Sequence, residues 1–306
     1  MPKTTESILD LTSQLAGFKI HLEAANRSPH TLAKYLMVAR QLIDFLRARG
    51  MPTATASVHR EHVESFIADT LESGLAAATA NTRYQALRVF FAYLVDEGEI
   101  TASPMERMKP PIVPEVLVPV VDDELLRRIL KGCSGRDFEG LRDAALFRLF
   151  AGTGPRLSEV AGMRVEDIDF NYRVTTVLGK GRRPRTVPFS PRTGQALVRY
   201  LKARSRHPLA DSPDKGPMWL GLRGPLTPSG IRQMVWRRSE AAGQRIHPHQ
   251  LRHTFAHTWL ADGGGETDLM MLAGWRSRSM LSRYGRSAAE ERAIAAHHRS
   301  SLTDRF

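Results

Sequence analysis

Apolar residues recur at intervals of three and four positions through the first third of the chain. The clearest stripes lie in residues 30–49, 59–72 and 79–97, and a weaker one lies in residues 5–24. This spacing places the apolar side chains on one face of a helix, where they can pack against a core. Residues 1–106 are therefore predicted to form a helical domain.

Prolines become dense in the segment SPMERMKPPIVPEVLVPV, residues 103–120. Because proline lacks a backbone N–H and has a fixed φ, such a segment cannot continue a helix and forms an extended, semi-rigid connector. The sequence therefore predicts a linker over residues 107–119 and a second domain over residues 120–306.

The second domain mixes helical and strand patterns. Helical spacing over residues 122–131 and 138–151 stops at GTGP, residues 152–155. Residues 164–189 alternate polar with apolar positions and are broken by turn residues such as Gly179-Lys180-Gly181, which favours a three-stranded antiparallel sheet. Further helices are expected at residues 191–205, 228–242, 248–262, 266–273, 277–284 and 287–298. The predicted fold class is mainly α with a small antiparallel β-sheet.

The charge balance adds a class of partner to this picture. Lys and Arg total 44 against 32 Asp and Glu, which gives a formal net charge of +12. Such an excess favours a polyanion such as nucleic acid, although some membrane-surface proteins share it. In the helical domain Lys34, Arg83 and Arg88 lie on polar faces, where they are candidates to contact a DNA backbone or simply water.

The single cysteine, Cys133, excludes an internal disulfide and a cysteine-based zinc finger. The N-terminus lacks the basic-then-apolar signature of a secretory signal, and no apolar run is long enough to span a membrane. We therefore expect a cytoplasmic protein without a membrane partner.

Residues 247–256, HPHQLRHTFA, open the question of chemistry. His249, His253 and His257 recur every fourth residue, a spacing at which two histidines can share a metal ion. However, no glutamate stands beside the first histidine as in HExxH, and the neighbouring Arg245 and Arg252 repel a cation. No metal is expected here.

A second interpretation is an ordinary packed helix. Leu251, Phe255 and Trp259 form its apolar stripe, so His253 and His257 are best explained as hydrogen-bonding members of that helix. His249 and Arg252 share a neighbouring face, because they are three residues apart, and project together.

A third interpretation is a phosphate-binding pocket. A guanidinium group meets two phosphate oxygens as a fork, and two arginines can neutralise a five-coordinate phosphorus transition state without a metal. Arg252 supplies one, and Arg156 in GTGPRLSEV supplies a second, with Glu159 placed to brace it. Lys180 at the predicted hairpin tip adds a third cation.

Tyr284 is the candidate nucleophile. A phenol has a pKa near 10 and attacks poorly until nearby cations stabilise its phenolate. The sequence supplies such cations around Tyr284, namely Arg276, Arg278, Arg283 and Arg286.

The ordered series Arg156, Lys180, His249-x-x-Arg252, Trp275 and Tyr284 resembles the active site of the tyrosine recombinases, the phage-integrase and Xer-type family. The phrases TGPRLSEV, GKGRRPRTVP and HPHQLRHTFA are similar to the family's TG-x-R-x-SE-[LV], GKG-x-[KR]-x-R-x-[VI]-P and H-x-LRH-[ST]-[FA]-A. Residues 31–35 and 86–111 also resemble the family's core-binding domain and its exit. The resemblance covers nearly the whole chain.

The resemblance implies a site-specific recombinase or integrase with a helical, SAM-like core-binding domain and an α+β catalytic domain. Tyr284 would attack a DNA phosphodiester and form a 3′-phosphotyrosyl link. Arg156 and Arg252 would clamp the phosphate, Lys180 would protonate the leaving oxygen, and His249 would handle the tyrosine proton or bind the phosphate. The covalent intermediate requires no cofactor, neither metal nor ATP.

The resemblance also implies roles for residues around these six and for the C-terminal segment. Glu159 would orient Arg156 from behind. The family most often has histidine in place of Trp275, whose indole keeps an N–H donor but cannot exchange protons. Pro155 also replaces a larger apolar residue. The segment after Tyr284 would dock into a neighbouring protomer, giving a dimer on each DNA site and a tetramer in the synapse.

Three functions remain open at this stage. The first is DNA strand exchange, and the C-terminal sequence favours a mobile element over a housekeeping Xer protein. The second is a nicking-closing enzyme that relaxes DNA. The third is a catalytically weakened DNA-binding accessory protein of the same fold, which Trp275 keeps in consideration. Phosphate contacts carry no sequence information, so the choice of target DNA depends on which side chains enter the grooves.

Overall fold

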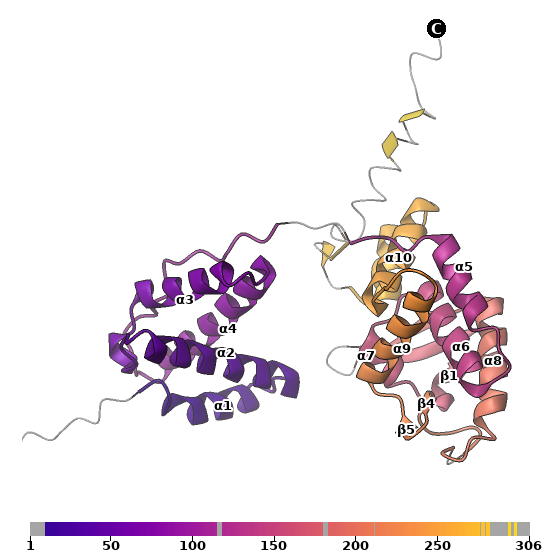
Figure 1. Ribbon diagram of the computed structural model, residues 1–306, viewed down its shortest axis with the longest axis horizontal. Helices are drawn as coiled ribbons and strands as arrows, with labels where there is room; N and C mark the ends of the chain where they lie inside the picture. Colours follow the sequence, from indigo (N-terminus) through magenta and orange to yellow (C-terminus); the bar gives the residue numbers. More distant parts are fainter. Residues whose placement is uncertain are drawn as a thin grey trace, which may run out of the picture. The chain divides into compact units, whose positions relative to one another are not determined.

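The chain divides into two compact units, Met1–Val116 and Leu117–Phe306, each with its own hydrophobic core (Figure 1). The sequence-predicted linker, residues 107–119, contains this division. The computed structural model describes residues 10–114, 118–179, 183–210, 212–275, 277–278, 280–281, 293–294 and 297–298. No helix in these ranges is both long and apolar enough to cross a bilayer.

The first unit is built from helices, as its apolar stripes predict. They are α1 (Gln14–Ala24), α2 (Pro29–Ala48), α3 (Arg60–Glu72) and α4 (Ala77–Asp96), with a short 3-10 turn, η1 (Thr55–Ser57). Ser28 starts α2 by accepting a hydrogen bond from the Thr31 amide (3.2 Å), and Pro29 occupies the first turn. Aromatic rings from α1 and α4 meet in the core, where the ring centroids of Phe18 and Phe90 are 4.9 Å apart.

Of the helix expected over residues 5–24, residues 5–9 lie outside the described part of the chain, residues 10–13 are not helical, and α1 begins at Gln14. Before it, Asp10 forms an isolated β-bridge with Ala54, and the Leu11 amide donates to the Thr53 carbonyl (3.0 Å). The chain therefore pairs with a distant segment and turns before it enters α1, which a local apolar pattern does not reveal.

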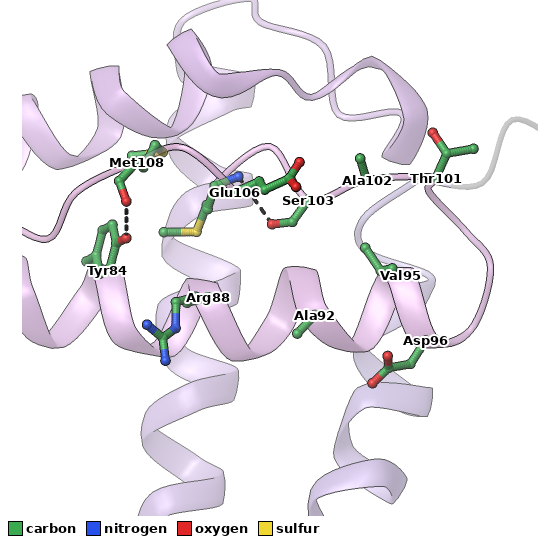
Figure 2. A pocket seen from close by; sticks show the side chains of 11 residues that line it. Tyr84, Arg88, Ala92, Val95, Asp96, Thr101, Ala102, Ser103, Glu106 and Met108 are labelled. Atoms are coloured by element: carbon green, nitrogen blue, oxygen red, sulfur yellow. Dashed lines mark hydrogen bonds between the residues drawn. The ribbon is translucent and has the colours of Figure 1, made fainter.

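The exit from the first unit runs back along α4. The Tyr84 hydroxyl donates to the Met108 carbonyl (2.6 Å), and Met105 is buried in the helical core. The segment and α4 enclose a pocket, with Arg88 and Asp96 on the α4 side and Glu106 on the other (Figure 2). The chain therefore remains attached to the first unit at least as far as Met108.

Helices of the second unit surround one central helix, α6 (Phe138–Thr153). It contacts α8 (Pro191–Arg204) and α10 (Pro248–Ala261) on different sides, and buried residues are found all round it. The remaining helices are α5 (Asp123–Gly132), α7 (Leu157–Ala161), α9 (Pro228–Ala241) and α11 (Glu266–Ala273), with a 3-10 turn, η2 (Val165–Asp167).

The predicted three-stranded antiparallel sheet is present in the second unit. Its strands run in the order β1 (Ile168–Asp169), β2 (Val174–Leu178) and β3 (Pro184–Pro188), with Thr175 opposite Val187. A second, two-stranded ribbon, β4 (Leu220–Gly221) with β5 (Gly224–Pro225), was not predicted, because strands of two residues carry no readable alternation. The fold class, mainly α with a small antiparallel sheet, is confirmed.

A buried carboxylate also ties two elements of the second unit together. Asp143 on α6 is fully buried and accepts hydrogen bonds from Arg142 Nε and from Arg238 Nε of α9, both at 2.8 Å. The two arginines thus provide hydrogen bonds to both oxygens of this buried carboxylate. This arrangement is called the Asp143 bridge below.

Candidate active site

Arg156 lies in the turn between α6 and α7. Gly154 ends α6 in the left-handed conformation (φ 59°), and a side chain there would collide with the Phe255 ring. Arg156 then occupies the N-cap position of α7, and its backbone N–H donates to the Glu159 carboxylate (2.7 Å). The GTGPRLSE phrase thus fixes the backbone of Arg156 while leaving its side chain one-third exposed, at 33%.

The Glu159 carboxylate is buried and accepts four hydrogen bonds. Two come from Arg156, from the backbone N–H and from Nη1 (2.8 Å), and two come from Arg185, from Nη1 (2.6 Å) and Nη2 (2.7 Å). Burial alone would raise the pKa of Glu159, but these bonds from Arg185 and Arg156 outweigh it and lower the pKa from 4.5 to about 2. Glu159 is therefore an anion at neutral pH and braces both arginines.

Arg252 projects from α10 and is buried, with 2% of its surface exposed. Its Nη1 donates to the Gly154 carbonyl and its Nη2 to the Ala273 carbonyl, both at 2.6 Å. Its guanidinium carbon lies 5.3 Å from the centre of the Trp275 ring. The ends of α6 and α11 and the face of an indole thus hold this guanidinium in one orientation.

The C-terminal end of α11 is the point where the arginines meet. Three successive carbonyls accept one hydrogen bond each from a different arginine: Leu272 from Arg185 Nε (2.9 Å), Ala273 from Arg252 and Gly274 from Arg156 Nη2 (3.2 Å). The last carbonyls of a helix lack partners within the helix and carry the negative end of its dipole, so they suit cations.

The cluster brings Arg156 and Arg252 close together. Arg156 and Arg252 are far apart in the chain, yet they donate to adjacent carbonyls. Together with Arg185 they outnumber the single carboxylate of Glu159, so the described part of the cluster carries a net positive charge. Such a site has the chemistry to hold a phosphodiester and to stabilise extra negative charge on it.

The histidines of α10 occupy three different environments. His249 is exposed, His253 is buried, and His257 is half-buried. The rings of His249 and His253 meet edge to face, with centroids 5.0 Å apart. No cluster of His, Cys, Asp or Glu suited to a metal ion occurs among the residues that the structure describes. The His247 amide donates to the Gln250 side chain (2.8 Å), which caps the start of the helix.

Two predicted catalytic residues, Lys180 and Tyr284, lie outside the described residues, as do Arg276, Arg283 and Arg286. The base of the Lys180 hairpin is described: the Gly179 amide donates to the Arg183 carbonyl (2.8 Å). A Cβ on Gly179 would lie 3.6 Å from Glu159 Oε1 and 3.7 Å from Arg185 Nη1. The hairpin that carries Lys180 therefore starts directly beside the arginine cluster.

The three candidate DNA contacts of the first unit differ in their surroundings. Lys34 on α2 is half-buried. Arg83 donates to Thr70 Oγ1 (2.7 Å) and stacks on Phe66, with its guanidinium carbon 5.3 Å from the ring centre. Arg88 is exposed and lines the α4 pocket (Figure 2). Of the three, Arg83 is the one engaged in contacts that hold α3 and α4 together.

Arg185 is the site residue that sequence reasoning missed. It belongs to the phrase GKGRRPRTVP, where it matches the second basic position after the glycines, but nothing in the local pattern indicates its partners. Its position on β3 opposite Val177 and its half-buried state are consequences of the sheet register. Only the folded chain brings it to Glu159.

Comparison with known proteins agrees with this geometry. The description of the phage integrase family matches residues 119–291, and that of the phage integrase N-terminal SAM-like domain matches residues 15–98. A protein of Myxococcus xanthus described as tyrosine recombinase XerC is 32% identical over 282 residues, which cover 90% of this chain and 93% of the relative.

Solved structures of similar fold are also recombinases. XerH bound to a palindromic difH substrate superposes with a TM-score of 0.72 at 18% identity, covering 94% of this chain and 84% of XerH. A lambda integrase tetramer bound to a Holliday junction gives a TM-score of 0.67 at 18% identity, covering 88% and 78%. By family match, sequence identity and fold, the chain belongs to the phage integrase family and is a tyrosine site-specific recombinase.

Proposed function

We propose that this chain cuts and rejoins double-stranded DNA with Tyr284 as the nucleophile. The Tyr284 oxygen attacks the scissile phosphorus, a phosphotyrosyl bond to the 3′ end forms, and the bond to the 5′ oxygen breaks. The observation that carries the proposal is the placement of Arg156 and Arg252 on adjacent carbonyls directly before Trp275. Attack by a free 5′-hydroxyl of another strand reverses the step and completes the exchange.

Arg156 and Arg252 bind the non-bridging oxygens of the scissile phosphate. Before DNA arrives, Arg156 is held by Glu159 and the Gly274 carbonyl, and Arg252 by the Gly154 and Ala273 carbonyls, so little reorganisation is needed as negative charge grows on the phosphate. Preorganised donors of this kind are worth about 3 to 4 kcal/mol each in the transition state. The Trp275 ring supports Arg252, and its indole N–H is of the type that can donate to a phosphate oxygen.

Lys180 delivers a proton to the departing 5′ oxygen, and His249 accepts the tyrosine proton or hydrogen-bonds the phosphate. The exposed position of His249 at the start of α10, one turn before Arg252, supports this assignment. The phosphotyrosyl bond keeps the free energy of the broken phosphodiester, so the reaction requires neither ATP nor a metal ion.

The partners of this reaction are a DNA recombination site and further copies of the chain. Residues 1–106 act as the core-binding domain, with Lys34, Arg83 and Arg88 near the backbone, residues 107–119 as the linker and residues 120–306 as the catalytic domain. Two protomers occupy one site and four form the synapse, with the C-terminal segment docked in a neighbour. The assembly works on cytoplasmic, nucleoid-associated DNA. The lambda integrase tetramer on a Holliday junction supports this arrangement.

Covalent trapping on genomic DNA tests the proposal and identifies the target sequence in one experiment. The protein is incubated with sheared genomic DNA of its source, free DNA is removed under denaturing conditions, and the DNA still attached is sequenced. A nicked substrate built from the enriched sequence should then give a covalent adduct with the wild-type protein. Tyr284→Phe should give none, although it should still bind DNA.

The alternatives give different results in the same assay. A DNA-binding accessory protein forms no adduct with either protein, yet both bind DNA with a steep salt dependence. A nicking-closing enzyme forms the adduct but does not exchange strands between two substrates. Absence of an adduct with the wild-type protein on DNA that it binds would refute the proposed chemistry.

A further inference from the structure

Arg185 holds together the separate parts of the candidate site. It reaches from β3 to Glu159 with both terminal nitrogens and to the Leu272 carbonyl with Nε. Its side chain is 12% exposed, compared with 33% for Arg156. Its Nε, Nη1 and Nη2 all donate to acceptors within the protein, two of them to the Glu159 carboxylate, so these contacts act on neighbouring residues of the chain.

The same guanidinium lies against two glycines of the site. A Cβ on Gly274 would come within 3.2 Å of Arg185 Cδ and Nη1, and one on Gly179 would come within 3.7 Å of Nη1. Gly274 precedes Trp275, and Gly179 precedes Lys180. Arg185 therefore lies against the two glycines that directly precede Trp275 and Lys180, and both of these residues are proposed to act on the phosphate.

Arg185 also affects the charge of the site, because it shares the Glu159 carboxylate with Arg156. The Glu159 carboxylate is shared equally, with two hydrogen bonds from Arg156 and two from Arg185. With both arginines present, the carboxylate and Arg185 neutralise each other and the charge of Arg156 remains for a phosphate. Without Arg185, the buried carboxylate would pair with Arg156 alone, and that pair would be neutral.

We propose that Arg185 is a positioning residue that offsets the charge of Glu159, so that the Arg156 cation remains available to the scissile phosphate. It also links Glu159 to the end of α11 and contacts Gly179, the residue before Lys180. This inference rests on the proposed function, because it assigns Arg185 a task in the same cleavage step.

The first test replaces Arg185 by Gln and by Lys. The measured quantities are the single-turnover rate of covalent adduct formation at saturating nicked DNA and the dissociation constant for that DNA. Arg185→Gln should slow adduct formation about 100-fold, the range found when one preorganised charge-stabilising donor is lost. Binding should change by less than about 3-fold, because many other phosphate contacts remain. Arg185→Lys keeps the charge, so its rate of adduct formation should lie between the rates of wild type and Arg185→Gln.

A double variant separates charge from packing. Glu159→Gln combined with Arg185→Gln removes both members of the neutral pair and leaves Arg156 charged. If charge offset is the task of Arg185, the double variant should react about 10-fold faster than Arg185→Gln alone, a coupling typical of residues in direct contact. Glu159→Gln alone completes the cycle.

The Asp143 bridge provides a matched control. It has the same composition, a buried carboxylate between two arginines, but lies on α6 and α9. Arg238→Gln should destabilise the second unit as Arg185→Gln does while leaving the rate of adduct formation within about 3-fold of wild type. Tryptophan fluorescence establishes that each variant is folded before rates are compared.

The outcomes distinguish this inference from the function on which it rests. No adduct with wild type would overturn the function itself. A wild-type adduct together with an unimpaired Arg185→Gln would overturn only the inference. A slow Arg185→Gln that the double variant does not accelerate would refute the charge offset. If Arg185→Gln does not fold, Arg185→Lys and the double variant decide in the same way.

Discussion

The resemblance assigns Trp275 to a position that most often holds histidine, and the structure shows what the indole contacts there. Its ring is 6% exposed and lies under the Arg252 guanidinium. A cation held over a desolvated indole gains about 2 kcal/mol, a contribution that requires the ring and not proton transfer. The substitution of tryptophan for histidine is thus compatible with a working phosphate clamp.

Replacing Trp275 distinguishes the ring from its N–H group. Trp275→Phe keeps a ring under Arg252 and should slow adduct formation about 10-fold, whereas Trp275→Ala removes the support and should slow it about 100-fold. Both rates are measured with the nicked substrate at saturating DNA. Equal losses in the two variants would mean that the N–H donor, and not the ring, carries the effect.

The lowered pKa of Glu159 predicts a pH dependence of stability. Because the folded-state pKa, about 2, is below the ordinary 4.5, the stabilisation is complete above about pH 4.5 and is lost as the pH falls towards 2. Wild type should therefore exceed Glu159→Gln in unfolding free energy by up to about 3 kcal/mol at pH 5.

That difference should shrink as the pH approaches 2. Tryptophan fluorescence follows the second unit alone, because the four tryptophans, Trp219, Trp236, Trp259 and Trp275, all lie within it. A difference that stays constant from pH 5 to pH 2 would show that the Glu159 carboxylate is not the source of the stability.

At the residue scale, the sequence indicated which types of side chain the site uses but not how they are held. Arg156, Glu159 and Arg252 stand in recognisable phrases, and their candidacy follows from chemistry and resemblance. Arg252, and Arg156 through Nη2, donate to backbone carbonyls, which every residue possesses and no side-chain pattern reveals. Arg185 was missed for the same reason, since its partners come together only through the fold.

Among the elements, α11 has the greatest effect on the site through its last turn. Gly274 ends it in the left-handed conformation (φ 63°), close to Arg185. Gly263, just after α10, has a similar conformation (φ 83°) but open space around it. The two glycines therefore share a backbone requirement and differ only in their proximity to the arginines.

Replacing each glycine by alanine uses this difference. Both Gly274→Ala and Gly263→Ala should lower the unfolding free energy by about 1 kcal/mol, the usual strain of a left-handed alanine. Only Gly274→Ala should also slow adduct formation, by about 10-fold, because its Cβ displaces Arg185 and thereby disturbs Glu159. If Gly263→Ala slows the reaction equally, strain in the backbone and not contact with Arg185 is responsible.

The helices and the small sheet were the elements most accessible from sequence. The apolar spacing of the helices and caps such as Ser28 and Asp137 are local features, so a stretch of neighbouring residues contains them. The late start of α1 and the β4–β5 ribbon depend on pairing between segments, which a window of neighbouring residues does not contain. The helices expected at residues 277–284 and 287–298 fall largely outside the described residues and stay predictions.

At the scale of the whole molecule, the chain combines two independently packed units with an overall charge of +12. The first unit offers exposed cations such as Arg88, and the second carries the arginine cluster. If both units bind one DNA duplex, as proposed, the link between the two binding surfaces raises the overall affinity through effective concentration. We therefore expect most of the binding free energy to be electrostatic and salt-dependent.

Truncation after Ser287 tests the proposed exchange of the C-terminal segment. Because Arg156, Lys180, His249, Arg252 and Tyr284 are all retained, the shortened protein should still form the adduct on a single site. It should lose ordered assembly, seen as fewer two-protomer and four-protomer complexes in gel shifts and at least about 10-fold less strand exchange. Full strand exchange by the truncated protein would count against the docking role.

The meeting of three arginines at Leu272, Ala273 and Gly274 has a consequence for how this part of the chain can vary in length. One residue added within α11 would rotate everything after it by about 100°. All three carbonyls would then turn away from their arginines, so one insertion would break all three hydrogen bonds at once. A residue added in the turn before α11, residues 262–265, leaves the spacing of the acceptors within the helix intact, so length changes should accumulate there first.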